Sequence, residues 1–179
     1  YIHLRCHSEF SVTDGIVKIS DYTEKAKKIG MPAVALTDLS NVFGAVKFYK
    51  SAIEAGIKPI IGCDVWLENS VSRDQPYRLL ILCQNENGFL NLSALLSKAY
   101  LENQYRGRVE LKKEWFKEEN TIGLILLSGA TSGEIGQLII QGKLDQAHSA
   151  IHEWKNILSD RFYLELQRHG EGNFRQQQE

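Results

Sequence analysis

The stretch Asp21–Thr37, DYTEKAKKIGMPAVALT, contains the signals that decide the fold. Asp21–Glu24 has the form of a capping box, lysines follow in the later turns, and a glycine and a proline end the pattern. These features predict a helix over 21–29. The apolar run Ala33–Thr37 that follows is typical of a strand buried on both faces. A helix that leads directly into a buried strand is one half of a βα repeat.

The same alternation continues along the rest of the chain. Apolar runs predict further strands at Ile2–Cys6, Pro59–Leu67, Leu79–Cys83, Gly123–Leu127 and Phe162–Leu166. Helical periodicity predicts helices over 42–55, 88–101, 112–118, 132–140 and 143–158, with exposed loops at 69–75 and 103–108. Repeated βα units favour an α/β fold with a parallel sheet, open or closed into a barrel, and candidate site residues lie at the carboxyl ends of its strands.

Composition limits the classes of function. The 179 residues carry 21 Lys and Arg against 22 Asp and Glu, with 43% hydrophobic residues, which is typical of an ordinary globular domain. Without a basic excess, any role on DNA is expected to be indirect or local. No apolar run approaches a membrane span, and the dispersed cysteines Cys6, Cys63 and Cys83 favour a reducing cytoplasm. The first and last residues suggest a fragment of a longer chain.

Side chains that could carry chemistry gather at the first predicted strand. His3, Arg5 and His7 are spaced by two, so in a strand they project from one face. Two imidazoles there could share a zinc, manganese or iron ion with Asp14. They could equally form local hydrogen bonds, and the spacing alone leaves both interpretations open.

Other predicted strands also end in polar side chains. Asp38 and His169 follow two of them, Asp64 lies near the end of a third, and Glu165 alternates with apolar neighbours in the last strand. Each aspartate alone is more typical of a helix cap or a loop acid. Ligands that arrive from successive strand ends are, however, the way in which a parallel barrel assembles a site.

Several sequence blocks together resemble the polymerase-and-histidinol-phosphatase (PHP) family, in the branch at the amino terminus of bacterial replicative polymerases. The blocks are HLRCHSEFS at 3–11, LTD at 36–38, GAVKFY at 44–49 and GIKPIIG at 56–62, and the resemblance extends over essentially the whole chain. It implies a distorted, TIM-like barrel of about seven strands. Residues 1–179 would then be a partial domain whose last strand and helices follow Glu179.

The resemblance implies a polynuclear metal site that this chain has partly lost. The matching positions are His7, Asp14, Asp64 and His169, with Asp64 in place of the usual Glu, whereas Arg5, Leu39 and Arg78 stand in place of family histidines. A guanidinium is permanently cationic, and a leucine has no lone pair. We therefore expect a vestigial site in which Arg5 pairs with Asp14, Asp38 or Asp64, with no catalytic residue and no cofactor.

The resemblance implies a function for such a site. The leading hypothesis is a non-catalytic, metal-free structural and docking module of a cytoplasmic replicative polymerase. Its partners would be the rest of the polymerase, the proofreading exonuclease subunit and, indirectly, DNA, with no membrane. The alternative is an active phosphoesterase or 3′–5′ exonuclease with zinc or manganese on His7, Asp14 and His169. A third hypothesis is a sugar or amino-acid phosphatase whose anionic substrate is held by Arg5 and Arg78.

Overall fold

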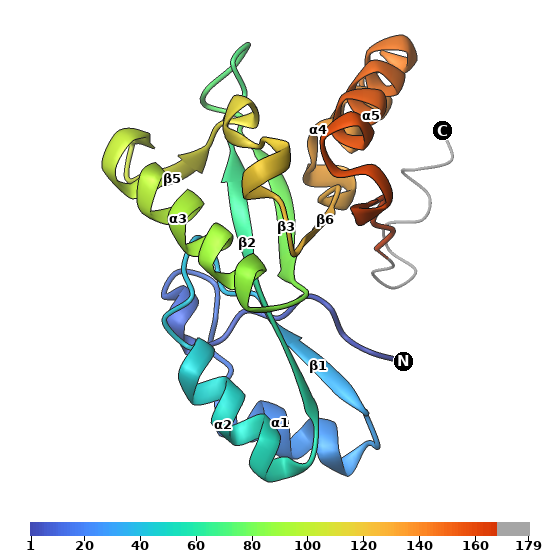
Figure 1. The fold of residues 1–179 in the computed structure, drawn as a ribbon. Coiled ribbons are helices and arrows are strands. Elements are labelled where there is room, and N and C mark those ends of the chain that lie inside the picture. The colour runs from blue at the N-terminus through green and yellow to red at the C-terminus, as the bar shows by residue number, and fades with distance from the viewer. Residues whose placement is uncertain (168–179) are drawn as a thin grey trace.

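One long strand, β2 (Lys58–Leu67), runs through the computed structural model and belongs to both halves of its sheet (Figure 1). Its first residues pair in parallel with β1 (Ala33–Leu36), and its later residues pair antiparallel with β3 (Tyr77–Cys83). The structure describes residues 1–167. Because β2 changes partner along its length, it joins a lower group of elements around β1 to an upper group around β3.

The remaining strands extend the upper half of the sheet. β3 pairs antiparallel with β6 (Leu124–Leu127), which pairs in parallel with β7 (Phe162–Tyr163). On the other side, the end of β2 pairs in parallel with β5 (Arg108–Leu111), which forms a hairpin with β4 (Gln104–Tyr105). Within residues 1–167 the result is a mixed, seven-stranded sheet that is not closed.

The prediction of a parallel sheet is therefore wrong and the seven strands of residues 1–167 do not form a closed barrel, although the α/β class is confirmed. The connection 68–76 between β2 and β3 contains no helix, so the chain returns directly and the two strands pair antiparallel. The predicted loop at 103–108 likewise contains the β4–β5 hairpin, whose turn uses the positive φ angles of Arg106 and Gly107. A parallel pair would have needed a crossover connection at each of these places.

Helices α1 (Ile19–Lys28) and α2 (Ala45–Ala55) pack against each other and against β1 in the lower half (Figure 1). Both predicted helices are confirmed with shifted starts. α1 begins after Lys18, whose side chain makes no capping hydrogen bond, so the predicted capping box is wrong. Asp21 lies instead in the first turn, where its negative charge still favours the helix start.

The upper half is covered by α3 (Glu86–Glu102) and α5 (Leu144–Leu158), with the short α4 (Glu134–Ile140) before α5. The side chain of Asn85 caps α3 by accepting a hydrogen bond from the Gly88 amide at 3.0 Å. These elements enclose the larger apolar core, which includes Leu92, Leu95, Leu96, Leu124, Leu126, Trp154 and Leu158. No helix within the described residues has the length and apolar character that a membrane crossing requires.

Some predicted elements are shorter or less regular in the structure. The helix expected over 112–118 consists of two 3-10 turns, Lys113–Trp115 and Glu118–Asn120. Further 3-10 turns occur at Glu9–Ser11, Ala130–Ser132 and Ser159–Arg161. The last predicted strand is limited to β7, and His169 lies outside the described residues.

The predicted first strand, Ile2–Cys6, is an extended segment and not a regular strand. Its carbonyls at His3 and Cys6 accept hydrogen bonds from the amides of Ala35 and Thr37, at 3.0 and 2.9 Å. The two accepting carbonyls are three residues apart, whereas the two donating amides are two residues apart. The extra residue interrupts the regular pairing, as it does in a β-bulge. Strict alternation had predicted that His3 shares one face with Arg5 and His7. In the structure His3 is exposed and does not join them.

Candidate functional site

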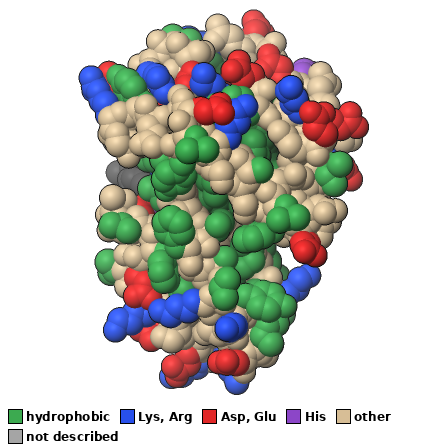
Figure 2. Space-filling view, turned by 60° about the vertical axis from the view of Figure 1, so that its left-hand side comes forward, with side chains coloured by type: hydrophobic (Ala, Val, Ile, Leu, Met, Phe, Trp, Pro, Cys, Tyr) green, Lys and Arg blue, Asp and Glu red, His purple; other side chains and the backbone are tan. Residues whose placement is uncertain are grey.

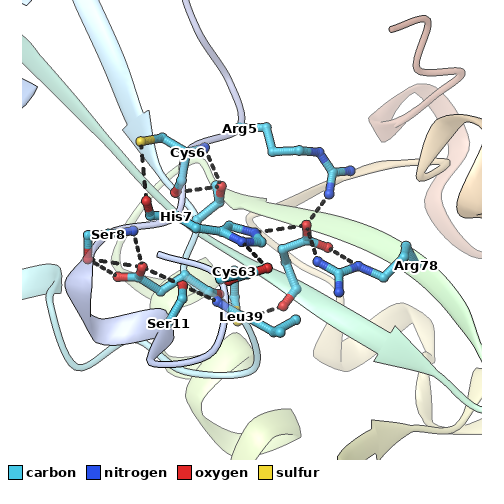
Figure 3. A network of polar contacts seen from close by, with 12 residues as sticks. Arg5, Cys6, His7, Ser8, Ser11, Leu39, Cys63 and Arg78 are labelled. Atoms are coloured by element: carbon cyan, nitrogen blue, oxygen red, sulfur yellow. Dashed lines mark hydrogen bonds and ion pairs between the residues drawn. The ribbon is translucent and has the colours of Figure 1, made fainter. Parts of the chain in front are cut away.

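Asp64 is the centre of the polar site and lies opposite Leu80, within the part of β2 that pairs with β3. Its side chain is fully buried, and its two oxygens accept hydrogen bonds from two arginines. Arg78 donates from Nε to Oδ1 at 3.1 Å and from Nη2 to Oδ2 at 2.7 Å, while Arg5 donates from Nη1 to Oδ2. Figure 3 shows the two labelled guanidiniums reaching one carboxylate. Such bidentate, charge-assisted contacts are among the strongest hydrogen bonds in proteins.

The register of the sheet explains why Arg78 reaches Asp64. Trp66 lies opposite Arg78, and Asp64 is two residues earlier on the same face of β2. The Arg78 guanidinium lies over the Trp66 ring, 4.2 Å from its centroid. This cation–π contact holds the guanidinium in the plane from which it meets the carboxylate. Nothing in the sequence had indicated this role of Trp66.

His7 connects Asp64 to the amino-terminal loop. Its Nδ1 lies 2.9 Å from Oδ2 of Asp14, and its Nε2 lies 3.1 Å from Oδ2 of Asp64. Because both partners are carboxylates, both contacts are hydrogen bonds only when both ring nitrogens carry a proton, which is the imidazolium form. Burial lowers the pKa of His7, but the hydrogen bond to Asp64 and the charges of both carboxylates outweigh burial and raise the pKa above its usual value.

Arg5 extends the network to the end of the described chain. Besides Asp64, it donates to Glu165, from Nε to Oε1 at 3.1 Å and from Nη2 to Oε2 at 2.7 Å. The Glu165 amide donates to Oγ of Ser128, which fixes this acid just after β7. The expected pairing of Arg5 with Asp64 is confirmed, whereas Asp14 and Asp38 do not bind Arg5 in the structure. The pairing with Glu165 was not predicted.

Asp38 organises a separate, neighbouring cluster. Its buried carboxylate accepts hydrogen bonds from the amide of Ser8 at 2.6 Å, from the hydroxyl of Ser8, and from the hydroxyl of Ser11 at 2.8 Å. Oγ of Ser11 in turn accepts from the amide of Leu39. Asp38 therefore stabilises the Ser8–Ser11 turn, as a loop acid does, and the turn positions His7.

The charges of the site are balanced among its own side chains. Burial raises the pKa of Asp64, but the hydrogen bond from His7, the charge of Arg5 and the contacts of Arg78 outweigh burial and lower the pKa below its usual value. Burial also lowers the pKa of Arg5, and its two acidic partners raise that pKa above the usual value. These contacts therefore favour the charged forms of Asp64 and Arg5. A cavity of about 610 Å³ lies beside it, lined by these side chains and by Trp66.

A metal ion does not fit the donor atoms as they stand. An imidazole nitrogen that donates a proton has no lone pair for a metal, and both oxygens of Asp64 already accept from guanidinium groups. Leu39 lies beside Asp64 in a β-bridge and offers an apolar side chain. Within residues 1–167, no group of three or more His, Cys, Asp or Glu side chains is arranged to hold a metal ion. Asp14 and Asp64 are brought together with His7 as expected, but through hydrogen bonds from His7 to each carboxylate.

Residues 3–169 match the PHP domain family, and the chain therefore belongs to the PHP domain family. Within it, the chain matches the amino-terminal region of bacterial DNA polymerase III alpha subunits. It is 43% identical over 177 residues to DNA polymerase III subunit alpha of Pseudomonas fluorescens, covering 99% of this chain. It is 44% identical over 169 residues to the same subunit of Neisseria meningitidis serogroup A, covering 94% of this chain. The chain spans only 15% of the length of each of these relatives.

Comparison with solved structures gives a more distant likeness. An amidohydrolase from Chromobacterium violaceum is 20% identical, with a TM-score of 0.43. The likeness covers 55% of this chain and 32% of that chain.

Proposed function

We propose that this chain is a non-catalytic PHP domain of a bacterial DNA polymerase III alpha subunit. It stabilises the amino-terminal part of the polymerase chain and provides a docking surface for the proofreading exonuclease subunit. It works in the cytoplasm, contacts DNA only through the rest of the polymerase, and needs no cofactor of its own. The identity to alpha subunits over nearly the whole chain supports the replicase setting.

One observation carries the non-catalytic part of the proposal, namely the two guanidiniums on Asp64. Arg5 and Arg78 remain charged at any physiological pH, so they repel a divalent cation from the carboxylate that they bind. The imidazolium of His7 adds a third positive charge. In this proposal the ion pairs hold the strand ends together, and they take the place of the metal that the family's ligand pattern implies. His169 stays a proposed position of the vestigial site.

Metal analysis tests this part directly. The purified chain is incubated with Zn²⁺ or with Mn²⁺, freed of unbound metal by gel filtration, and analysed by inductively coupled plasma mass spectrometry. We expect well below one metal ion per chain. A double variant, Arg5→His with Leu39→His, returns two imidazoles to the site and is expected to retain more metal than the unmodified chain.

The opposite result would support the active alternative. If the unmodified chain retained metal at one ion or more per molecule and hydrolysed bis(p-nitrophenyl) phosphate, the non-catalytic proposal would fail. Loss of both properties in His7→Ala would then assign the hydrolysis to this site and not to a contaminant.

Docking is tested separately. A purified bacterial proofreading exonuclease subunit is mixed with the chain, and co-elution is followed by size-exclusion chromatography. We expect a stable complex that does not depend on added metal. If the proteins elute separately at every concentration tested, the docking role is wrong, whatever the metal content.

A further inference from the structure

Helix α5 carries two histidines, His148 and His152, on the side that faces solvent. Both are exposed, and their spacing of four residues places one above the other on the helix. The helix buries a different set of residues in the larger core, namely Ala147, Ala150, Trp154 and Leu158. Figure 2 shows histidine at the surface near the upper end of the molecule, the half that α5 covers. Within residues 1–167 neither imidazole makes a hydrogen bond or an ion pair.

The spacing of the two imidazoles suits one metal ion. Side chains at positions i and i+4 of a helix have Cβ atoms about 5–6 Å apart. An imidazole nitrogen binds zinc at about 2.0–2.1 Å, so two rings at this spacing can share one ion. The metalloprotease motif His-Glu-x-x-His uses the same two positions. In this chain Ser149 stands in place of the glutamate, so the pair lacks the general base that hydrolysis requires.

The core holds the backbone of α5 in helical form. Trp154 is 1% exposed, and its ring lies 5.3 Å from the ring of Phe116 and 5.7 Å from that of Phe162, measured between centroids. Its indole nitrogen also donates to Glu134 at 2.9 Å. Because these contacts fix the helix, the two imidazoles need only adopt suitable rotamers to meet an ion. Little conformational entropy is therefore lost on binding.

Other side chains that bind transition metals are less suitable in the described part of the chain. His7 is held by two carboxylates, and His3 is exposed but has no histidine beside it. Cysteine binds metals as the thiolate. Burial raises the pKa of Cys6 and Cys63 above the usual value and that of Cys83 to about 12, which disfavours their thiolates at neutral pH. Among residues 1–167, two free imidazoles are thus neighbours only on α5.

Two exposed charges lie on the same side of α5 as the imidazoles. Asp145 is three residues before His148 and attracts a cation, whereas Lys155 is three residues after His152 and repels one. Glu153 is engaged in an ion pair at 2.7 Å. Since no three His, Cys, Asp or Glu side chains of residues 1–167 are arranged to hold a metal ion, Asp145 acts through its charge and not as a ligand. The protein therefore supplies two ligands, and water completes the coordination.

We propose that His148 and His152 bind one labile divalent transition-metal ion, such as Ni²⁺ or Zn²⁺, through one ring nitrogen each. Imidazole ligands favour this class of ion, whereas Mg²⁺ and Ca²⁺ prefer oxygen ligands. The site is separate from Asp64, and the inference goes beyond the proposed function. With only two protein ligands, the ion is expected to dissociate during gel filtration, so it does not disturb the metal analysis of the Asp64 site.

Paramagnetic Ni²⁺ provides the probe. It is titrated into the ¹⁵N-labelled chain, and the amide signals are followed by nuclear magnetic resonance. Every sample contains excess Mg²⁺, which occupies oxygen sites, and carries His3→Ala, which removes the other exposed imidazole of the described residues. We expect progressive broadening centred on residues 145–156. Calorimetry on the same samples measures the dissociation constant.

Variants locate the binding. His148→Ala and His152→Ala are each expected to weaken Ni²⁺ binding by about tenfold or more, because the remaining imidazole binds alone. The matched control, Gln146→His with His152→Gln, keeps the number of histidines but puts them at positions that do not face each other. It should bind as weakly as His152→Ala. Asp145→Asn should weaken binding and Lys155→Gln strengthen it, each by about two- to fivefold. All of these side chains are exposed, and circular dichroism checks that each variant folds.

The inference is overturned if the broadening is centred outside α5, or if the matched control binds as tightly as the starting chain. Broadening centred on His7 would contradict the proposed metal-free site as well. If no signal broadens even at millimolar Ni²⁺, this inference alone is wrong and the proposed function stands.

Discussion

Arg5 and Glu165 are 160 positions apart in the sequence, and their side chains form a bidentate ion pair. Arg5 also binds Asp64 in the middle of the sheet. One guanidinium therefore ties the amino-terminal segment, the central strand and the segment after β7 to one another. These contacts are non-local, so their formation depends on the whole fold being in place.

Arg5→Ala is expected to lower the free energy of unfolding by about 2 to 4 kcal/mol, because it leaves Glu165 without its cation and removes one of the two guanidiniums on Asp64. Urea denaturation measures the loss. Arg106→Ala is the control, since Arg106 pairs with Asp74 at the surface, where such pairs contribute about 1 kcal/mol or less. Equal stability of Arg5→Ala and the unmodified chain would contradict the structural role of the network.

The stability of the chain is expected to fall as the pH rises through the raised pKa of His7. The pKa of His7 is raised above 6.5, so its ionised contacts stabilise the fold below that pH and are lost as the pH rises through the raised value. The pKa of Asp64 is lowered below 3.8, so its contribution is lost only in acid. Urea midpoints measured from pH 5 to pH 9 should decline for the unmodified chain. His7→Gln should show a flatter profile, and identical slopes would refute this assignment.

Ser11→Ala is expected to destabilise the chain by about 1 to 2 kcal/mol, because it removes a hydrogen bond to the buried carboxylate of Asp38. Ser20→Ala, in which the lost hydroxyl contacts an exposed carboxylate, should have almost no effect. Thermal melting distinguishes the two. A larger loss in Ser20→Ala than in Ser11→Ala would mean that the Asp38 cluster does not hold the turn.

Gly15→Ala is expected to distort the loop that carries Asp14. A Cβ atom at this position would lie 1.8 Å from the carbonyl oxygen of Ser8, so the backbone must move apart. The free energy of unfolding should fall by about 2 kcal/mol or more. The resonances of the His7 ring protons should also shift in the nuclear magnetic resonance spectrum. Ile16→Ala, at a side chain that is 93% exposed, is the control. An unchanged His7 resonance in Gly15→Ala would show that this loop does not position the ring.

The sequence predicted element types well, and strand directions poorly. The runs that form β1, β2, β3 and β6 are apolar enough to be recognised alone, and α1, α2, α3 and α5 have clear periodicity. Direction depends on what joins two strands. The loop 68–76 is too short for a crossover helix, which favours an antiparallel pair, whereas the repeated βα pattern favours parallel strands.

Part of the site could be predicted from the sequence, and part could not. His7 follows an apolar run and Asp64 lies near the end of one, Asp14 was predicted to join the histidines beyond a short loop, and the charge of Arg5 required a carboxylate partner. Glu165 could not be assigned to Arg5, since no local pattern links residues so far apart.

Because β2 pairs with both β1 and β3, the two halves of the sheet are expected to unfold together. The amides of one strand are protected partly by β1 and partly by β3, so neither half can open fully without exposing backbone groups of the other. Hydrogen exchange should therefore report a single slow-exchanging unit that includes β1, β2 and β3. A pulling force applied to the amino-terminal segment would be transmitted along β2 to the far end of the sheet. The domain would then unfold in one step.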